Sequence, residues 1–212
     1  MAQFFTIYPN NVNMRLIYQA VAILKDGGIV VYPTDSCYAL GCLLDNKHAV
    51  TRIREIRQLD EEHYLTLMCR DLSEISNYAR VDNTQFRLLK ANTPGSYTFI
   101  LEATREVPKR LQHPKRSTIG IRIPDHPVAL ALLEALGEPM SSSTLILPEQ
   151  PWPLDDAELI RELLEKKVDA VIDGGAAGTD FTTVIDLTGT LPVLLRQGMG
   201  DIAPFGIMTH AN

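Results

Sequence analysis

The chain has 212 residues, of which 45% are apolar and 22% are charged, so it can build its own core without disulfide bonds or metals. Its 20 lysine and arginine residues against 26 aspartate and glutamate residues give a formal net charge of −6, which excludes nucleic-acid binding by bulk attraction. The N-terminal segment shows no cationic leader, and no apolar run approaches about 18 residues. We therefore expect a cytoplasmic protein with no membrane partner.

The first half of the chain alternates between helical and strand patterns. Apolar residues recur with a helical period between 12 and 26, where "DGG" ends the helix: Leu16, Ala20, Ile23 and Leu24. Next come strands at 29–32 and 37–44, a helix over 47–58 with Val50, Ile53 and Ile56 on one face, a strand at 64–69, and helices near 71–79 and 83–91.

The second half continues this alternation. Strands at 97–102 and 118–123 precede a helix over 127–136, which Pro127 opens and Gly137 closes. A serine-rich segment at 139–147, a proline-rich connector at 148–153, a helix over 155–165 and strands at 168–173, 182–187 and 192–196 follow. Helices alternating with short apolar strands predict one α/β domain over residues 1–212, with a single twisted sheet covered on both faces.

Several common kinds of site are not indicated. The sequence has no Gly-rich nucleotide loop of either common type and no G-x-S-x-G elbow. The histidines, at 48, 63, 113, 126 and 210, lack ligand spacing, so we predict no metal site. Three cysteines in apolar contexts are interpreted as buried free thiols rather than catalytic groups: Cys37, Cys42 and Cys69. The acidic pairs Glu61/Glu62 and Asp155/Asp156 are interpreted as solvated or capping carboxylates.

Small hydroxyl residues interrupt or follow several strands, and they are the first candidate site. They are Thr34 with Ser36, the run Ser141–Thr144, and Thr182 with Thr183. Each alone fits a strand-end turn, but together they fit the oxygens of a phosphate or carboxylate, because open α/β sheets bind ligands at strand ends. Three basic partners accompany them: Arg57, Arg122 and Arg196. The segment "DGGAAGTD" at 173–180 is either a flexible turn or an anion cradle.

A basic segment, "REVPKRLQHPKRS", is the second candidate. It carries one glutamate and five cations: Arg105, Lys109, Arg110, Lys115 and Arg116. It is either a solvated loop or a surface for the phosphates of RNA.

The ordered motifs "YPTDSCYALG", "PGSYTFIL", "TIGIRIPDHPVALALL", "SSST", "TTVIDLTG" and "LLRQG" resemble the YrdC-like family of threonylcarbamoyl-AMP synthases, and most closely its YciO branch. The resemblance runs from about residue 12 to 206. It implies a strongly twisted mixed sheet of about seven strands, flanked by helices, around a concave basic cleft. Synthases of this family use L-threonine, bicarbonate and ATP with magnesium as substrates, with no tightly bound cofactor, for a modification of tRNA.

The resemblance also implies roles for individual residues. Thr34 would help to hold the amino-acid substrate, Asp35 would order the turn, and Ser36 takes the place of the family's second threonine. Catalytic roles fall on Thr34, Arg57 and Arg196. Substrate or nucleotide contacts fall on Ser36, His63, Arg122, Ser142, Thr144, Thr182 and Thr183.

Two departures from the family pattern weaken the expected chemistry. A family arginine falls on Leu59, and a family asparagine falls on Ile146. Each loss would cost about 1 to 3 kcal/mol in binding or catalysis. Two hypotheses follow: a nucleotidyltransferase with weak or altered threonylcarbamoyl-adenylate chemistry, or an accessory protein that binds double-stranded RNA, rRNA or tRNA through the basic segment.

Overall fold

The computed structural model describes residues 1–60, 63 and 65–207. The interpretations made above for Glu61, Glu62 and His210, and the first residue of the strand predicted at 64–69, lie outside the described residues. Within the described residues, no helix combines the length and the apolarity that crossing a membrane requires.

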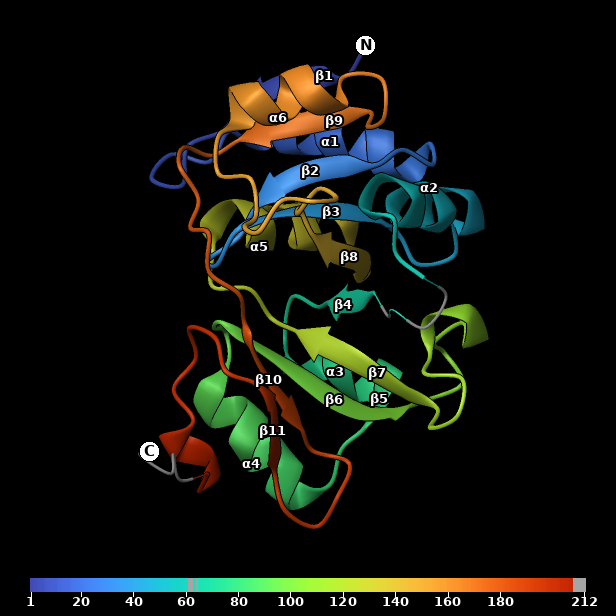
Figure 1. Ribbon diagram of the computed structural model, residues 1–212, viewed down its shortest axis with the longest axis vertical. Coiled ribbons are helices and arrows are strands. Elements are labelled where there is room, and N and C mark those ends of the chain that lie inside the picture. Colours follow the sequence, from blue (N-terminus) through green and yellow to red (C-terminus); the bar gives the residue numbers. More distant parts are fainter. Residues whose placement is uncertain (61–62, 64, 208–212) are drawn as a thin grey trace.

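Helices and strands occur in nearly the predicted order (Figure 1). The strands are β1 Gln3–Thr6, β2 Val30–Pro33, β3 Tyr38–Leu43, β4 Thr66–Met68, β5 Ala79–Arg80, β6 Tyr97–Ala103, β7 Thr118–Arg122, β8 Met140–Thr144, β9 Ala170–Asp173, β10 Thr183–Asp186 and β11 Val193–Arg196. The helices are α1 Met14–Lys25, α2 Lys47–Arg57, α3 Leu72–Tyr78, α4 Asn83–Asn92, α5 Pro127–Leu136 and α6 Ala157–Leu164, with short 3-10 turns at Lys109–Leu111 and Ala203–Phe205.

The described strands form one mixed sheet in the order β1-β9-β2-β3-β8-β4-β7-β6-β10-β11, with β5 paired to β6. The sheet combines parallel pairs, such as β4 with β7 and β6 with β10, with antiparallel ones, such as β3 with β8. The α/β class and the mixed sheet are confirmed. The expected number of about seven strands is wrong, because the sheet has 11 strands within the described residues. Two of the added strands, β1 and β5, have only four and two residues.

Two apolar clusters fill the space between the sheet and its helices. One cluster joins α1 and α5 to the sheet through residues such as Leu24, Leu132, Val30 and Ile172. The other includes α2 and α6 on the β2–β9 part of the sheet and α3 and α4 on the β6–β7 part. Figure 1 shows α1, α2, α5 and α6 around the upper strands, and α3 and α4 around the lower ones.

The helices begin and end largely as the sequence indicates. Asn13 and Asn46 cap α1 and α2, and Pro127 and the left-handed Gly137 delimit α5. The predicted apolar face of α2 is confirmed, since Val50, Ile53 and Ile56 are buried. The helix predicted between 12 and 26 is confirmed as α1, in which Ile17, Ala20, Val21 and Leu24 are buried and Leu16 and Ile23 are partly buried against the same cluster.

Candidate functional site

A cavity of about 540 Å³ opens on the face of the sheet formed by β4, β6, β7 and β10. Alternate residues of these strands line it, for example Thr98 and Ile100 of β6, and Thr118, Gly120 and Arg122 of β7. The residues between them, such as Phe99 and Leu101, pack in the core with α3 and α4 on the other side. Because a strand presents successive side chains to opposite faces, this part of the sheet has one face packed against helices and one face of mixed polar and apolar side chains that lines the cavity.

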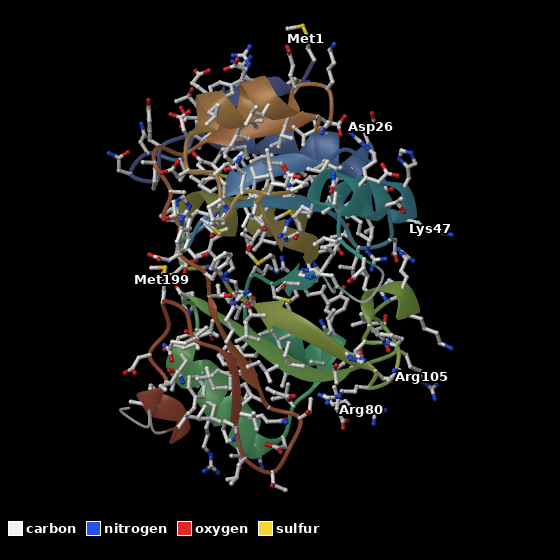
Figure 2. All side chains as sticks on the ribbon, in the orientation of Figure 1. Met1, Asp26, Lys47, Arg80, Arg105 and Met199 are labelled. Atoms are coloured by element: carbon white, nitrogen blue, oxygen red, sulfur yellow. The ribbon has the colours of Figure 1, made fainter. Side chains whose placement is uncertain are left out.

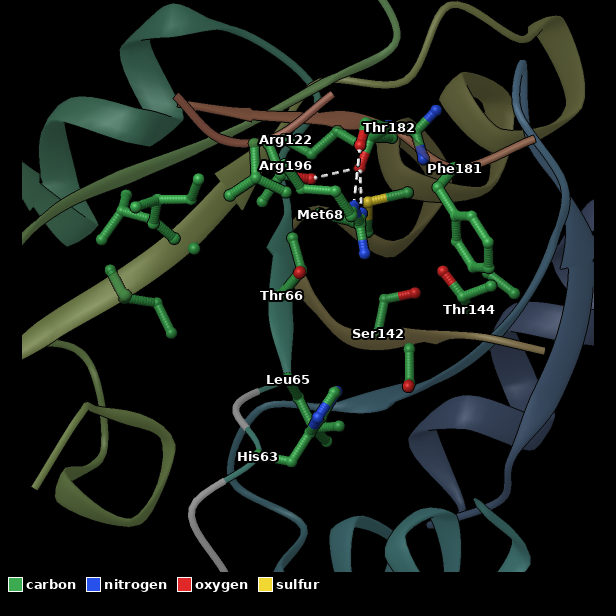
Figure 3. A pocket seen from close by; sticks show the side chains of 18 of the residues that line it. His63, Leu65, Thr66, Met68, Arg122, Ser142, Thr144, Phe181, Thr182 and Arg196 are labelled. Atoms are coloured by element: carbon green, nitrogen blue, oxygen red, sulfur yellow. Dashed lines mark hydrogen bonds between the residues drawn. The ribbon is translucent and has the colours of Figure 1, made fainter. Parts of the chain in front are cut away.

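The cavity is strongly cationic. Four arginines line it: Arg57, Arg116, Arg122 and Arg196. Among the described lining residues, the carboxylate is that of Asp186, whose Oδ2 lies 3.6 Å from Nη1 of Arg116. In Figure 3, Arg122, Arg196 and Thr182 gather at one end of the view, His63 lies at the other, and Thr66 and Ser142 lie between them. Guanidinium and hydroxyl donors of this kind suit the oxygens of an anion.

Arg196 is fixed at the end of β11 by Thr182, the residue before β10. Its Nε donates to the carbonyl oxygen of Thr182 at 3.1 Å, and its Nη2 donates to the Thr182 hydroxyl at 3.1 Å. The Thr182 hydroxyl also lies 3.0 Å from that of Thr98. Burial lowers the pKa of Arg196, and the positive charge of Arg122 lowers it further.

Arg57, the last residue of α2, reaches across to β8. Its Nη1 donates to the Ser143 hydroxyl at 2.6 Å, and its Nε donates to the carbonyl oxygen of Ile146 at 3.1 Å. Burial lowers the pKa of Arg57 to about 10, and repulsion from Arg196 acts in the same direction. Among the described residues, no ion pair joins a carboxylate to the guanidinium of Arg57 or of Arg196. An anionic ligand would relieve this repulsion between desolvated cations.

Arg122 is anchored by the corner between β2 and β3. Its Nη1 donates to the Ser36 hydroxyl at 3.0 Å, and its Nη2 is paired with Asp35. Asp35 also accepts hydrogen bonds from the Ser96 hydroxyl at 2.6 Å and from the backbone N–H of Asp125 at 3.0 Å. Asp35 therefore ties three segments together beneath the cavity.

Thr34 holds the corner itself. Its hydroxyl donates to the carbonyl oxygen of Cys37 at 2.6 Å and accepts from the backbone N–H groups of Ser36 and Cys37 at 3.2 Å. Both Thr34 and Ser36 are buried, and neither lines the cavity. The predicted contact between Thr34 and an amino-acid substrate stays a prediction, and the described geometry uses this hydroxyl in the turn.

Thr183 is also outside the cavity lining. Its hydroxyl donates to the carbonyl oxygen of Gly200 at 2.6 Å and accepts from the N–H of Gly198 at 3.0 Å. A Cβ added at Gly198 would lie 2.3 Å from the carbonyl oxygen of Phe181. The structure thus gives Thr183 and Gly198 the task of holding the segment after Arg196 against β10.

The remaining predicted contacts come together in the cavity: His63, Ser142, Thr144 and Thr182. Ser142 already accepts a hydrogen bond from the Tyr32 hydroxyl at 2.7 Å and donates to the carbonyl oxygen of Leu40 at 3.1 Å. Partial burial lowers the pKa of His63, and the guanidinium of Arg57 lowers it further, so its imidazole is neutral at pH 7. His63 therefore adds no positive charge to that of the cavity arginines at this pH.

The five cations of the basic segment differ in their contacts. Arg116 lines the cavity, and Nη2 of Arg110 donates to the carbonyl oxygen of Leu44 at 2.8 Å. The side chains of Arg105, Lys109 and Lys115 are exposed. Figure 2 shows Arg105 on the outer surface of the lower half of the molecule. All five predicted RNA contacts are nevertheless exposed residues, and Arg110 and Arg116 additionally make contacts within the protein.

Several lining residues were missed by sequence reasoning. They include Cys37, Thr66, Met68, Thr98, His113, Thr118, Gly120, Phe181, Val184 and Asp186. A signal was present, because threonine, glycine and arginine occupy every second position of "TIGIR" and threonine stands at the start of "TFIL", where a fully buried strand would carry large apolar residues. Such alternation indicates that one face of a strand is not packed against a helix. The predicted burial of the free thiols Cys37, Cys42 and Cys69 is confirmed.

Fold and cavity together define an α/β protein in which a mixed sheet keeps one uncovered face, lined with arginines and hydroxyls. The chain belongs to the Sua5–YciO–YrdC family, since the model of that family, described as "Telomere recombination", matches residues 22–198. This confirms the resemblance inferred from the ordered motifs.

Individual relatives agree with this assignment. The chain is 58% identical over 205 residues to the uncharacterized protein YciO of Escherichia coli K12, covering 97% of this chain and 100% of that protein. The crystal structure of E. coli YciO matches with a TM-score of 0.93. The threonylcarbamoyl-AMP synthase of Klebsiella pneumoniae is 30% identical over 194 residues, covering 89% of this chain and 99% of the synthase. The structure of P. abyssi Sua5 complexed with L-threonine matches at 28% identity with a TM-score of 0.84, covering 92% of this chain and 57% of that one.

Proposed function

We propose that the cavity binds ATP with magnesium and an amino acid or related carboxylate, and that it carries out adenylate-forming chemistry of the threonylcarbamoyl-AMP synthase type. The products would be threonylcarbamoyl-adenylate, or a close analogue, and pyrophosphate. The observation that carries this proposal is the gathering of four arginines in one cavity, with Asp186 as the carboxylate among its described lining residues.

The arrangement supports phosphoryl chemistry because such reactions depend mainly on position and charge. A carbamate oxygen must attack the α-phosphorus of ATP while the bond to the pyrophosphate group breaks, and negative charge accumulates on the phosphate oxygens. Arg57 and Arg196 are already held by hydrogen bonds to Ser143 and Thr182. Donors that are fixed before the reaction stabilise that charge without reorganising.

The proposal includes a reduced rate. Leu59 is partly buried against the core, and Ile146 offers its backbone carbonyl to Arg57, so neither side chain supplies a donor to a phosphate. The synthase in Klebsiella pneumoniae and the L-threonine in the P. abyssi Sua5 structure indicate which substrates to try first. A specificity altered from theirs is part of the proposal.

Pyrophosphate release tests the proposed activity. The purified protein would be incubated with ATP, magnesium, bicarbonate and L-threonine, and then with each component omitted in turn. The proposal predicts slow pyrophosphate release that requires both ATP and the amino acid, together with an adenylate product detected by mass spectrometry. No ATP turnover with L-threonine or any other amino acid, in a folded protein, would contradict it.

A second candidate function, association with double-stranded RNA, is favoured by the exposed cations of the basic segment, among them Arg105, Lys109 and Lys115. Binding through phosphates should weaken steeply with salt, and each contact removed should reduce the log–log slope by a little under one unit. RNA binding would be measured over a salt series for wild type, a triple glutamine variant and Thr34→Ala. Equal binding by wild type and the triple variant would show that the loop is only solvated.

A further inference from the structure

Phe181 directly precedes Thr182, and its ring lines the cavity beside Arg196. The central carbon of the Arg196 guanidinium lies 5.1 Å from the centre of the Phe181 ring. A guanidinium within about 6 Å of an aromatic face is attracted by the negative charge of that face. Figure 3 shows the Phe181 ring on the same side of the cavity as Thr144.

Three contacts together fix the plane of Arg196. Two are the hydrogen bonds from Nε and Nη2 to Thr182, and the third is the ring of Phe181. A guanidinium has five N–H groups in a rigid fork, and these two bonds use two of them. The remaining N–H groups stay available to an anion in the cavity. A side chain that is ordered before binding loses less conformational entropy when the ligand arrives.

We propose that Phe181 is a positioning residue for anion binding: its ring holds the Arg196 guanidinium in the orientation that presents its free N–H groups to a polyphosphate. This inference rests on the proposed function, which makes a polyphosphate the anion. Leucine at position 181 would fill a similar volume but would neither attract the cation nor define its plane. Tyrosine would keep both properties.

The chain contains a matched control. Arg161 of α6 lies over the ring of Phe4 of β1 at the same distance, 5.1 Å, and neither residue lines the cavity. Phe4→Leu therefore removes an equivalent stack elsewhere in the molecule. Any general effect of losing a phenylalanine ring should occur in both variants, whereas an effect on anion binding should follow only from Phe181→Leu.

The experiment is calorimetric titration with inorganic tripolyphosphate and with magnesium-ATP. Phe181→Leu should weaken tripolyphosphate binding by about three- to thirtyfold, and it should weaken ATP binding by a similar factor. Phe181→Tyr and Phe4→Leu should stay within about twofold of wild type, the range expected when the stack at Arg196 is kept. Thermal unfolding would confirm that each variant is folded, and Phe181→Met provides a second variant without a ring.

The outcomes separate this inference from the proposed function. Unchanged tripolyphosphate binding by Phe181→Leu or Phe181→Met, when wild type binds it, overturns the inference alone. Weakened ATP binding with unchanged tripolyphosphate binding would assign the ring to the nucleobase, and it also overturns the inference. Tripolyphosphate binding by Phe181→Tyr that is as weak as binding by Phe181→Leu would show that the role of Phe181 is purely structural. If wild type binds neither tripolyphosphate nor magnesium-ATP, the proposed function is overturned, and the inference with it.

Discussion

The cavity and the basic loop both carry cations, but they organise them differently. Arg57 is half-buried and Arg196 is exposed on the cavity side, but both are held by hydrogen bonds, to Ser143 and Thr182, and the pKa of each is lowered by partial desolvation. The cations of the loop, Arg105, Lys109 and Lys115, are exposed to solvent. Solvated cations are screened and must lose side-chain entropy on binding, whereas fixed and partly desolvated ones have met that cost during folding. The number of cations in a region therefore does not locate an anion site. Cations that are held in place by hydrogen bonds do.

The largest expected effect is a loss of stability when Asp35, which anchors Arg122 at the cavity, is replaced. Asp35→Asn keeps the size of the side chain but leaves the buried guanidinium of Arg122 without its carboxylate. Breaking a buried ion pair from one side costs about 3 to 5 kcal/mol, so the free energy of unfolding should fall by that amount in urea denaturation. Asp45→Asn, at an exposed carboxylate 4.0 Å from Arg110, should cost less than about 1 kcal/mol. Equal losses in the two variants would refute the anchoring role of Asp35.

The next largest expected effect is a loss of activity when a fixed cation of the cavity, Arg57, is removed. Arg57→Gln deletes a donor aimed at the cavity, and the loss of one such donor typically lowers kcat by about 10²- to 10³-fold. The rate of pyrophosphate release would be compared with that of Arg80→Gln, which changes an exposed arginine of β5. A similar rate for Arg57→Gln and Arg80→Gln would show that Arg57 has no part in the chemistry.

Restoring the missing donors should have a moderate and opposite effect. The double variant Leu59→Arg with Ile146→Asn should form the adenylate faster, by about ten- to hundredfold for each restored contact. Leu59→Met with Ile146→Leu, which changes the same positions without adding donors, is the control. A folded double variant with no gain would mean that other parts of the cavity have diverged from the synthases.

The smallest effect concerns pH. Partial burial and the charge of Arg57 lower the pKa of His63, so the ring is neutral at pH 7. A bound polyphosphate favours the protonated ring and raises its pKa, so binding takes up a proton and tightens as pH falls toward the ordinary histidine pKa of about 6.5 and below. Tripolyphosphate affinity at pH 5.5 and 7.5 would be compared in wild type and His63→Gln, because the ligand itself titrates. An identical pH dependence in both proteins would exclude His63.

Most of the fold follows from sequence patterns. Helix α2 was predicted with its buried face because Val50, Ile53 and Ile56 recur with a helical period between clear end signals. Strands β1 and β5 were missed because four and two residues are too few to show alternation. In α1, the helical period did not specify that Ile17 and Val21 would be buried, because burial depends on the packing of α1 in the same cluster as α5.

The residues of the site were less predictable than the fold, because the type of a residue does not determine which group its side chain contacts. Thr34 and Thr182 are both strand-end threonines, yet one closes a turn and the other lies in the cavity beside Arg196. Arg110 and Arg116 belong to the same basic segment, and only the folded loop sends one to Leu44 and the other to the cavity. Phe181 gave no signal, since its role depends on an arginine 15 residues further along the chain.

One titration compares the two regions directly. Magnesium-ATP would be titrated calorimetrically into wild type, Arg196→Gln and the triple variant Arg105→Gln, Lys109→Gln and Lys115→Gln. Loss of a fixed, charged donor should weaken ATP binding by about ten- to hundredfold in Arg196→Gln, whereas removing three solvated charges should change it by less than about threefold. A triple variant that loses as much affinity as Arg196→Gln, or an Arg196→Gln variant that binds like wild type, would contradict the assignment of the anion site to the cavity.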